Sequence, residues 1–354
     1  MDLPPSGKTV TIRDLAKRLQ LSHATVSMAL RDHPKIALKT RQRVKEEAES
    51  AGYRPEPMLS ALAAYRQMKK PSLYHGTIAW VFNNCTRAAM LSIPLYRQYY
   101  EGACWRANEL GYRIDEYYIQ EPDMRAIRLS NILHARGVQG ILLPPQPRLG
   151  LELDMRWDVF STVAFGFSLH APHHHVISST QYRNSIMAVQ CLIKLGYERI
   201  GFFGNTEFDD RTDGNFSAGI HTATKNLPSS RKIPPLLTRE NSKLPKTITE
   251  IRSWIAHWKI DAVVCVTGMQ ELLTQAGFQI PEDFAVALLN TQDEFQEFAG
   301  IDEQGFRTGA AAVDYVVGMI HRGERGIPQA PIQLLMEGKW RDGATAPPIR
   351  HSNC

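Results

Sequence analysis

Between residues 77 and 322, short apolar runs alternate with amphipathic stretches, and this alternation constrains the fold more than any other feature. Helical stretches are predicted near residues 95–110, 124–136, 184–195, 270–276 and 305–322. The apolar runs read TIAWVF, RIDEYYI, GILLPP, STVAFGF, IGFFG, DAVVCV and FAVALLN. Parallel strands covered by helices on both faces read as near-continuous apolar runs. We therefore predict doubly wound parallel α/β sheets for this part of the chain.

The surplus positive charge lies in the first fifth of the sequence. Residues 1–70 hold 14 Lys and Arg against 7 Asp and Glu, whereas the remainder holds 27 against 29. A basic segment on a near-neutral body is typical of a nucleic-acid-binding head. The length of 354 residues also favours two or three domains over one.

Residues 9–55 have the periodicity of three short helices. Thr11 and Ser22 are suited to cap the first two helices, and the third is predicted over residues 38–50 and ends at Gly52. The apolar positions predicted to face inward are 12, 15, 16, 19, 26, 30, 44 and 48. Three short helices with a tight turn between the first two predict a helix-turn-helix, although any small helical pair has a similar pattern.

The run VTIRDLAKRLQLSHATVSMALRDHPKIALKTRQRVKEEAESAGYRP resembles the DNA-binding domain of the LacI family of bacterial transcription regulators. The shared elements are V-T-I-x-D-L-A, L-S-x-x-T-V-S-x-A-L, K-T-R-x-R-V and A-x-x-x-G-Y-x-P. The resemblance implies that bases are read by His23, Ala24 and Met28. It implies phosphate contacts by Thr11, Ser22, Thr25, Ser27, Arg31, Thr40 and Tyr53, and Lys39, Arg41, Arg43 and Lys45 add positive charge nearby.

Two positions depart from the family pattern. Many members carry Arg where this chain has Met28, and Met offers only apolar contact, for instance to a thymine methyl. Ala37 stands where a Ser often caps the third helix. We therefore expect an operator that differs from that of typical members.

The resemblance also implies a hinge helix and linker at residues 56–72. The candidate helix is 57–64, with Leu62 as a minor-groove wedge assisted by Met58 and Ala61. An ordinary linker helix is the competing interpretation.

The rest of the chain resembles the family's core of two periplasmic-binding-protein-like subdomains, through G-Y-x-x-I, P-E-D-F-A-V and G-A-T-A-P-P. By that resemblance, residues 75–178 with 305–332 form one subdomain and residues 179–304 with 333–354 form the other. Ligands bind outside the carboxyl ends of such strands. The candidate effector residues are Asn83, Asn84, Gln146, Phe165, Arg211, Phe216, Thr267 and Asn290.

The effector signature of sugar-binding members is altered here. Phe216 stands where an Arg is usual, Arg211 is nearby but out of register, and Asn290 replaces an Asp. Loss of these charge-assisted contacts indicates either a different, less polar ligand or none. Tyr96, Tyr99, Tyr100 and Trp105 have helical spacing and are more typical of a core or dimer surface than of a ligand site.

Other functional classes receive less support. No phosphate-loop, dinucleotide or nucleophile-elbow motif is present, so we predict no enzyme and no cofactor. Three consecutive histidines, 173–175, point to alternating sides of an extended segment, and we predict no metal site. The five scattered cysteines favour reduced thiols.

We predict a cytoplasmic repressor that binds a pseudo-palindromic DNA operator as a homodimer and responds to a small-molecule effector. The sequence shows neither a membrane span nor a secretory signal. The alternative is a cytoplasmic or exported solute-binding protein for a sugar, without a regulatory role.

Overall fold

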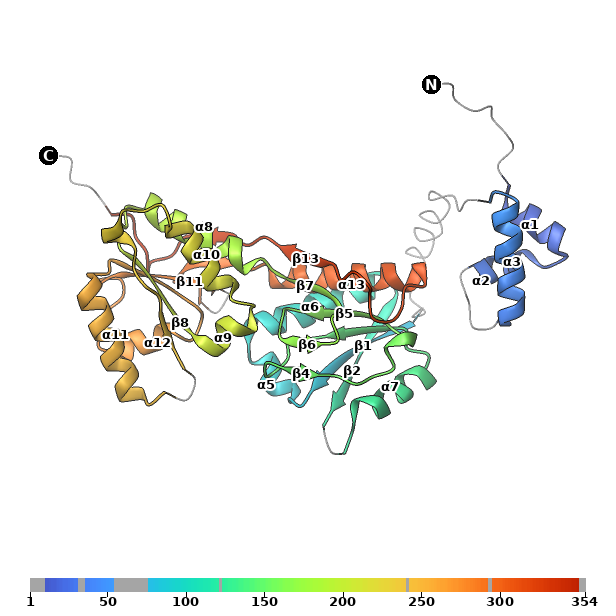
Figure 1. Ribbon diagram of the computed structural model, residues 1–354, viewed down its shortest axis with the longest axis horizontal. Helices are drawn as coiled ribbons and strands as arrows, with labels where there is room; N and C mark the ends of the chain where they lie inside the picture. The colour runs from blue at the N-terminus through green and yellow to red at the C-terminus, as the bar shows by residue number, and fades with distance from the viewer. Residues whose placement is uncertain are drawn as a thin grey trace, which may run out of the picture.

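The computed structural model describes residues 10–30, 36–53, 76–120, 123–239, 242–291 and 295–349. These residues form a helical head, residues 10–53, and an α/β body, residues 76–349, that contains two six-stranded sheets (Figure 1). The predicted fold class is confirmed, with an all-α head followed by two sheets in which parallel pairing dominates.

The head consists of α1 (Ile12–Leu19), α2 (His23–Leu30) and α3 (Leu38–Ser50) around a small apolar core. These bounds agree with the periodicity. Leu15, Val26 and Val44 are fully buried at its centre. Leu30 packs against this core as predicted, although it is only partly buried, and Ala29, which the periodicity did not single out, is fully buried. The inward face of α2 is therefore centred nearer Val26 and Ala29, an i, i+3 pair.

Side-chain caps define where the helices of the head begin. Thr11 and Asp14 form a reciprocal capping box on α1: the Asp14 amide donates to Thr11 Oγ1 at 3.3 Å, and the Thr11 amide donates to Asp14 Oδ2 at 2.9 Å. The Thr25 amide donates to Ser22 Oγ at 3.0 Å, so Ser22 caps α2 as predicted. Ala37 provides no side-chain cap to α3. The φ of +67° at Gly52 closes that helix, and the Tyr53 amide donates to Ala48 O at 2.9 Å.

The first sheet has six parallel strands in the order β13-β7-β5-β3-β1-β2. Helices α6 (Pro94–Glu109) and α13 (Gly305–Arg322) cover one face, and α7 (Ala126–Ala135) covers the other. The strands are β1 (Gly76–Asn83), β2 (Tyr112–Ile119), β3 (Gly140–Leu143), β5 (Ser161–Phe165), β7 (His175–Ser179) and β13 (Gln333–Met336). Smaller elements nearby are α5 (Arg87–Leu91), β4 (Leu151–Glu152), η1 (Trp157–Val159) and β6 (Leu169–Ala171).

The second sheet has the order β14-β12-β11-β10-β8-β9 and is parallel except for β14. Helices α8 (Gln181–Lys194) and α10 (Asn215–Thr224) cover one face, and α11 (Leu244–Trp258) and α12 (Gln270–Gln275) cover the other. The strands are β8 (Ile200–Asn205), β9 (Leu236–Thr238), β10 (Ala262–Cys265), β11 (Ala285–Thr291), β12 (Ala299–Asp302) and β14 (Lys339–Arg341). Two short helices, α9 (Thr206–Arg211) and η2 (Ser229–Arg231), complete this half.

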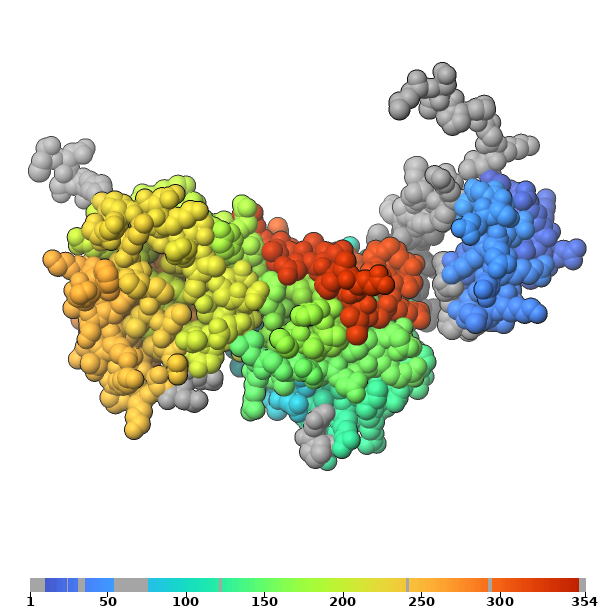
Figure 2. Space-filling view, viewed as in Figure 1, coloured from blue at the N-terminus to red at the C-terminus, as the bar shows by residue number. Residues whose placement is uncertain are grey.

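The chain crosses between the sheets three times, after β7, after β12 and after β13. Residues 333–336, predicted to belong to the second subdomain, pair with β7 in the first sheet, so the third crossing follows Met336. We call residues 76–179 with 305–336 the first subdomain, and residues 180–304 with 337–349 the second. Figure 2 shows them as two lobes, with the red segment of α13 lying on the first. Asn184 joins two crossings, since it donates to Ser179 Oγ and accepts from the Gly338 amide.

Helices α6 and α13 pack closely because glycines lie at their contact. A Cβ atom added at Gly309 would lie 2.0 Å from the carbonyl oxygen of Tyr99. A Cβ at Gly102 would lie 1.9 Å from the carbonyl oxygen of Phe306. Both distances are far below van der Waals contact, so only glycine permits this approach of the two backbones.

No helix in the described parts of the chain is both long and apolar enough to cross a lipid bilayer.

Candidate functional sites: the head and the cavity between the subdomains

The N-terminal half of α2 presents a polar surface. His23 is exposed, and Thr25, Ser27 and Met28 are partly exposed. Ala24 lies on the same helix. Val26 and Ala29 anchor the opposite face in the core of the head. The predicted base-reading residues therefore share one short helix, and that helix is held by an apolar core on its other side.

The hydroxyl groups around this surface also support the local fold. Ser22 Oγ and Thr25 Oγ1 lie 2.8 Å apart and form a hydrogen bond. Thr11 Oγ1 donates to Asp14 Oδ2 at 2.7 Å, and hydrogen bonds from Thr11 lower the pKa of the Asp14 carboxyl. Three of the predicted phosphate-contacting residues thus take part in helix caps.

Two charged contacts join α3 to α1 within the head. Arg43 Nη2 donates to the carbonyl oxygen of Leu19 at 3.2 Å, at the C-terminal end of α1, so this guanidinium also stabilises the turn. Arg18 forms an ion pair with Glu47 at 3.4 Å. Lys39 and Lys45 are exposed. Thr40 and Tyr53 are partly buried, and burial raises the pKa of the Tyr53 hydroxyl.

Four predicted DNA-contacting residues lie outside the described residues. They are Arg31, Met58, Ala61 and Leu62. The predicted hinge helix and linker at 56–72 lie there as well.

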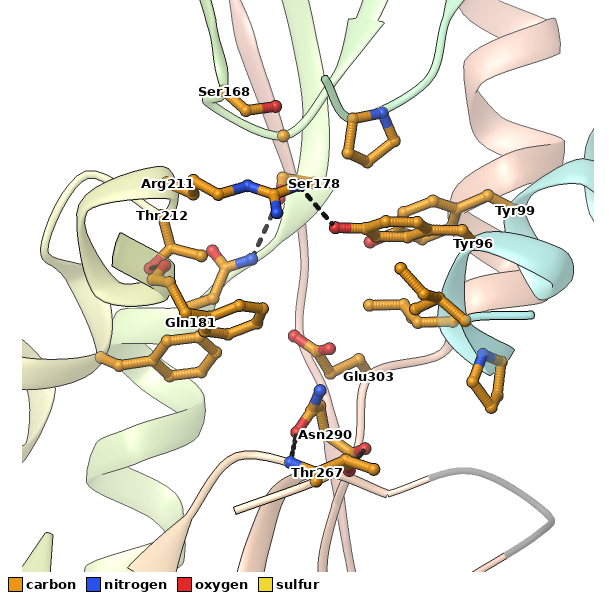
Figure 3. Close-up of a pocket in the computed structure, with 18 of the residues that line it drawn as sticks. Tyr96, Tyr99, Ser168, Ser178, Gln181, Arg211, Thr212, Thr267, Asn290 and Glu303 are labelled. Atoms are coloured by element: carbon orange, nitrogen blue, oxygen red, sulfur yellow. Dashed lines mark hydrogen bonds between the residues drawn. The ribbon is translucent and has the colours of Figure 1, made fainter. Parts of the chain in front are cut away.

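A cavity of about 300 Å³ lies between the two subdomains (Figure 3). Tyr96 and Tyr99 on α6 line it from the first subdomain, and Phe208 and Phe216 line it from the second. The Phe208 and Phe216 rings stack with centroids 5.8 Å apart. Four predicted effector residues line this cavity: Arg211, Phe216, Thr267 and Asn290.

Arg211 joins the subdomains across the cavity. Its Nη2 donates to the carbonyl oxygen of Gln146 at 2.7 Å and to the Tyr96 hydroxyl at 3.4 Å. Figure 3 shows this guanidinium reaching from the second subdomain toward Tyr96. The sequence places Arg211 out of register with the Arg that is usual in the family. The end of α9 nevertheless brings Arg211 to the lining of the cavity between the subdomains.

Asn290 and Thr267 close the end of the cavity beneath Glu303 in Figure 3. Asn290 Oδ1 accepts from the Thr267 amide at 2.7 Å, and Thr267 Oγ1 donates to the Asn290 carbonyl oxygen at 2.7 Å. The Asn290 side chain therefore links the ends of β10 and β11, and its Oδ1 already accepts a hydrogen bond within the protein.

The other four predicted effector residues are not among those that line this cavity. Phe165 is fully buried in the core of the first subdomain, where it stacks on Tyr99 at 5.0 Å. Asn83 Nδ2 donates to Gln146 Oε1 at 2.9 Å in a buried contact. Asn83 and Asn84 line a second hollow of about 290 Å³ beside Arg125, Glu152 and Asp154.

Several polar residues of the cavity were missed from the sequence, among them the buried Glu303 and Gln181. Glu303 follows β12 at the second crossing, and Gln181 begins α8 just after the first. Glu303 is 2% exposed. Burial raises the pKa of its carboxyl to about 7, the nearby Asp302 adds to the rise, and a hydrogen bond from Ser179 opposes it. Both residues lie in connections without a repeating pattern, so periodicity gave no signal for either.

The consecutive histidines have separate structural surroundings. His175 on β7 is buried; its Nε2 lies 3.1 Å from Glu324 Oε1, and its Nδ1 accepts from the Ile332 amide. His174 packs its ring on Trp157 at 4.4 Å, and burial lowers its pKa to about 4. Within the described residues no group of three metal-ligating side chains is found.

Comparison with protein families gives one match. Residues 11–56 match the model described as bacterial regulatory proteins, lacI family. The likeness to the lacI family therefore lies in the head. The comparison with curated proteins gave no match.

Solved structures extend the likeness over the body. The complex of the transcriptional regulator CelR with cellobiose is 18% identical, with a TM-score of 0.55 over 95% of this chain and 99% of that one. The Lac repressor dimer bound to operator and the anti-inducer ONPF is 17% identical, with a TM-score of 0.55 over 96% and 100%. A transcription-regulator-like protein from Staphylococcus haemolyticus is 15% identical, with a TM-score of 0.57 over 77% and 99%. At these identities the likeness establishes the fold alone, a helical head followed by an α/β body with two mainly parallel sheets.

Proposed function

We propose that this protein is a sequence-specific transcription repressor that acts in the cytoplasm. Two copies would place their α2 helices in successive major grooves of a pseudo-palindromic operator, and a small ligand in the cavity would change the fraction bound to DNA. The observation that carries this proposal is the head: residues 11–56 match the lacI family, and α2 presents an exposed polar face.

The chemistry of the side chains indicates which residues would read bases and which would bind phosphates. His23 and Met28 would meet base edges, because the N-terminal part of the second helix enters the groove. Thr25, Ser27 and Thr40 would donate to phosphates, which positions the head without reading sequence. Lys39 and Lys45 would add salt-dependent affinity.

The body supports a ligand-responsive role. The cavity lies between two subdomains joined by three crossings, so a ligand that contacts both can favour one arrangement over another. A ligand shifts such an equilibrium only by its difference in affinity for the two arrangements. Among the structural neighbours, CelR holds cellobiose and the Lac repressor holds an anti-inducer.

The test is selection of operator sequences from random duplex DNA with the purified full-length protein. We expect enrichment of a palindrome whose half-sites are centred about one helical turn apart or a multiple of it. If the selection enriches no sequence at low salt, the proposal is overturned. A solute-binding protein without a regulatory role would give that outcome.

Met28→Arg then tests the base-reading assignment. We expect a changed preference at one position of each half-site, toward guanine, because Arg binds guanine bidentately. Thr274→Arg is the matched control, because it adds the same charge at an exposed position on α12. If both variants keep the wild-type preference, Met28 does not read bases.

A further inference from the structure

We propose that the cavity between the subdomains takes a small aromatic amine, with its protonated nitrogen against Glu303 and its ring among the aromatic side chains. This inference rests on the proposed function, because it names the class of ligand for that same cavity. An aromatic amine differs from the sugars that the usual effector signature, altered in this chain, would predict.

The first step is the position of Glu303. Its side chain is almost completely buried, yet it lines the cavity, and Figure 3 shows its carboxyl projecting into the space between Tyr96 and Gln181. Its Oε1 has no hydrogen-bond partner among the described residues. A buried acceptor without a partner is costly, and a ligand that donates to it removes that cost.

The second step is the character of the remaining polar groups. Gln181 is 7% exposed, and its Oε1 likewise has no partner within the described part of the chain. The donors at the other end are already engaged, because Arg211 donates to Gln146 and Tyr96. Among the described residues, the two buried atoms of the cavity lining that lack a partner are both acceptors, Glu303 Oε1 and Gln181 Oε1, which favours a ligand that donates hydrogen bonds.

The third step is the aromatic lining. Six rings line the cavity: Tyr96, Tyr99, Phe167, Phe208, Phe216 and Phe295. Aromatic faces attract a cation and accommodate a flat apolar body. Phe216 stacks on Phe208 and lines the cavity, so these two side chains offer ring contact and no charged group. A volume of about 300 Å³ suits one ring with a short side chain.

The charges that face Glu303 favour a cation there. Asp302 is the neighbouring acid and raises the pKa of Glu303, whereas Ser179 donates to its carboxyl. Burial raises the pKa of the Tyr96 and Tyr99 hydroxyls, and the negative charge of Glu303 raises both further. The positive charge of Arg211 lowers the pKa of Tyr96. A protonated amine would supply the missing positive charge at the Glu303 end and hold the carboxyl ionised.

The experiment is calorimetric titration of the full-length protein with three probes of one shape: phenethylamine, 2-phenylethanol and 3-phenylpropionate. Cellobiose serves as the sugar probe. We expect phenethylamine to bind at least tenfold more tightly than the alcohol, and the carboxylate and cellobiose not to bind. Equal binding of amine and alcohol, or preferential binding of the carboxylate or of cellobiose, would overturn the inference.

Two further measurements locate the contact. In Glu303→Gln the advantage of the amine over the alcohol should disappear, whereas the exposed control Glu282→Gln should keep it. If the first variant does not fold, the wild-type pH profile decides. The affinity for phenethylamine should rise about tenfold from pH 6 to pH 8 as Glu303 ionises, and the affinity for the alcohol should stay flat. A flat amine profile would contradict the proposal.

These results separate this inference from the proposed function. Amine binding is measured without DNA, and operator selection is measured without ligand. Amine binding with no operator would refute the regulator and leave the ligand class standing, whereas an operator with no amine binding would refute only the ligand class.

Discussion

Glu303→Gln should make the protein more stable at high pH, although it alters a buried position. Burial raises the pKa of this carboxyl from an ordinary value near 4.5 to about 7. In the folded state the group keeps its proton up to about pH 7, whereas in the unfolded chain it ionises near pH 4.5. The folded state therefore loses stability as pH rises from 4.5 to 7, by about 3 kcal/mol in total.

Glutamine keeps the shape of the protonated acid and cannot ionise, so the variant escapes this loss. The free energy of unfolding of the variant minus that of wild type should be about 3 kcal/mol larger at pH 8 than at pH 5. For a body of this size, that corresponds to roughly 6–12 °C in melting temperature. Thermal melts of the ligand-free protein from pH 5 to pH 8.5 measure it, with Glu282→Gln as the exposed control. A difference between variant and wild type that does not change with pH would refute the reasoning.

Three other predictions follow from contacts already described. Gly309→Ala should lower the stability by several kcal/mol, because its Cβ would lie 2.0 Å from the Tyr99 carbonyl oxygen, and unchanged denaturant midpoints would contradict this. Thr11→Ala should cost about 1 kcal/mol of head stability through loss of the capping box, measurable by the melting of the head. His174→Phe should make the folded state less sensitive to acid. Burial lowers the pKa of His174 from 6.5 in the unfolded chain to about 4 in the folded state, so wild type loses stability as pH falls from 6.5 to 4. If wild type and His174→Phe lose stability equally over that range, His174 is not the group responsible.

The head was predictable because its information is local. Capping residues and apolar spacing gave the bounds of all three helices, since each signal lies within one turn of the helix it starts. Ala29 was missed because the i, i+4 pair of Val26 and Leu30 was read alone, whereas the core also uses an i, i+3 pair. Arg43 could not be recognised as a partner of the Leu19 carbonyl, because that contact joins two helices.

The strands of the body were predictable where they form a continuous apolar or aromatic run, as in β1, β2, β3, β5, β8, β10 and β11, whereas β7 and β12 are buried but were missed. β13 was missed because Leu334 and Leu335 are exposed at the edge of the sheet, and residues 333–354 were assigned together to the second subdomain. In the cavity, strand ends led to Thr267 and Asn290 correctly as lining residues. Asn83 and Gln146 end strands too, but they bind each other, and sequence does not show which strand-end side chains pair among themselves.

The three crossings have a consequence for how the protein is made. Helix α13, residues 305–322, and strand β13, residues 333–336, complete a sheet whose other strands end by residue 179. A chain emerging from the ribosome therefore exposes the bare face of α6 and the unpaired edge of β7 until nearly the whole polypeptide has been synthesised. The second lobe has five of its six strands, and all four of the helices that cover its faces, by residue 302, whereas the first lobe still lacks α13 at that point. Because domains generally fold as units and both lobes wait for a strand after residue 332, we expect neither lobe to complete its native packing until the C-terminal part has been made. Nascent chains released before residue 336 should then recruit chaperones through the α6 face.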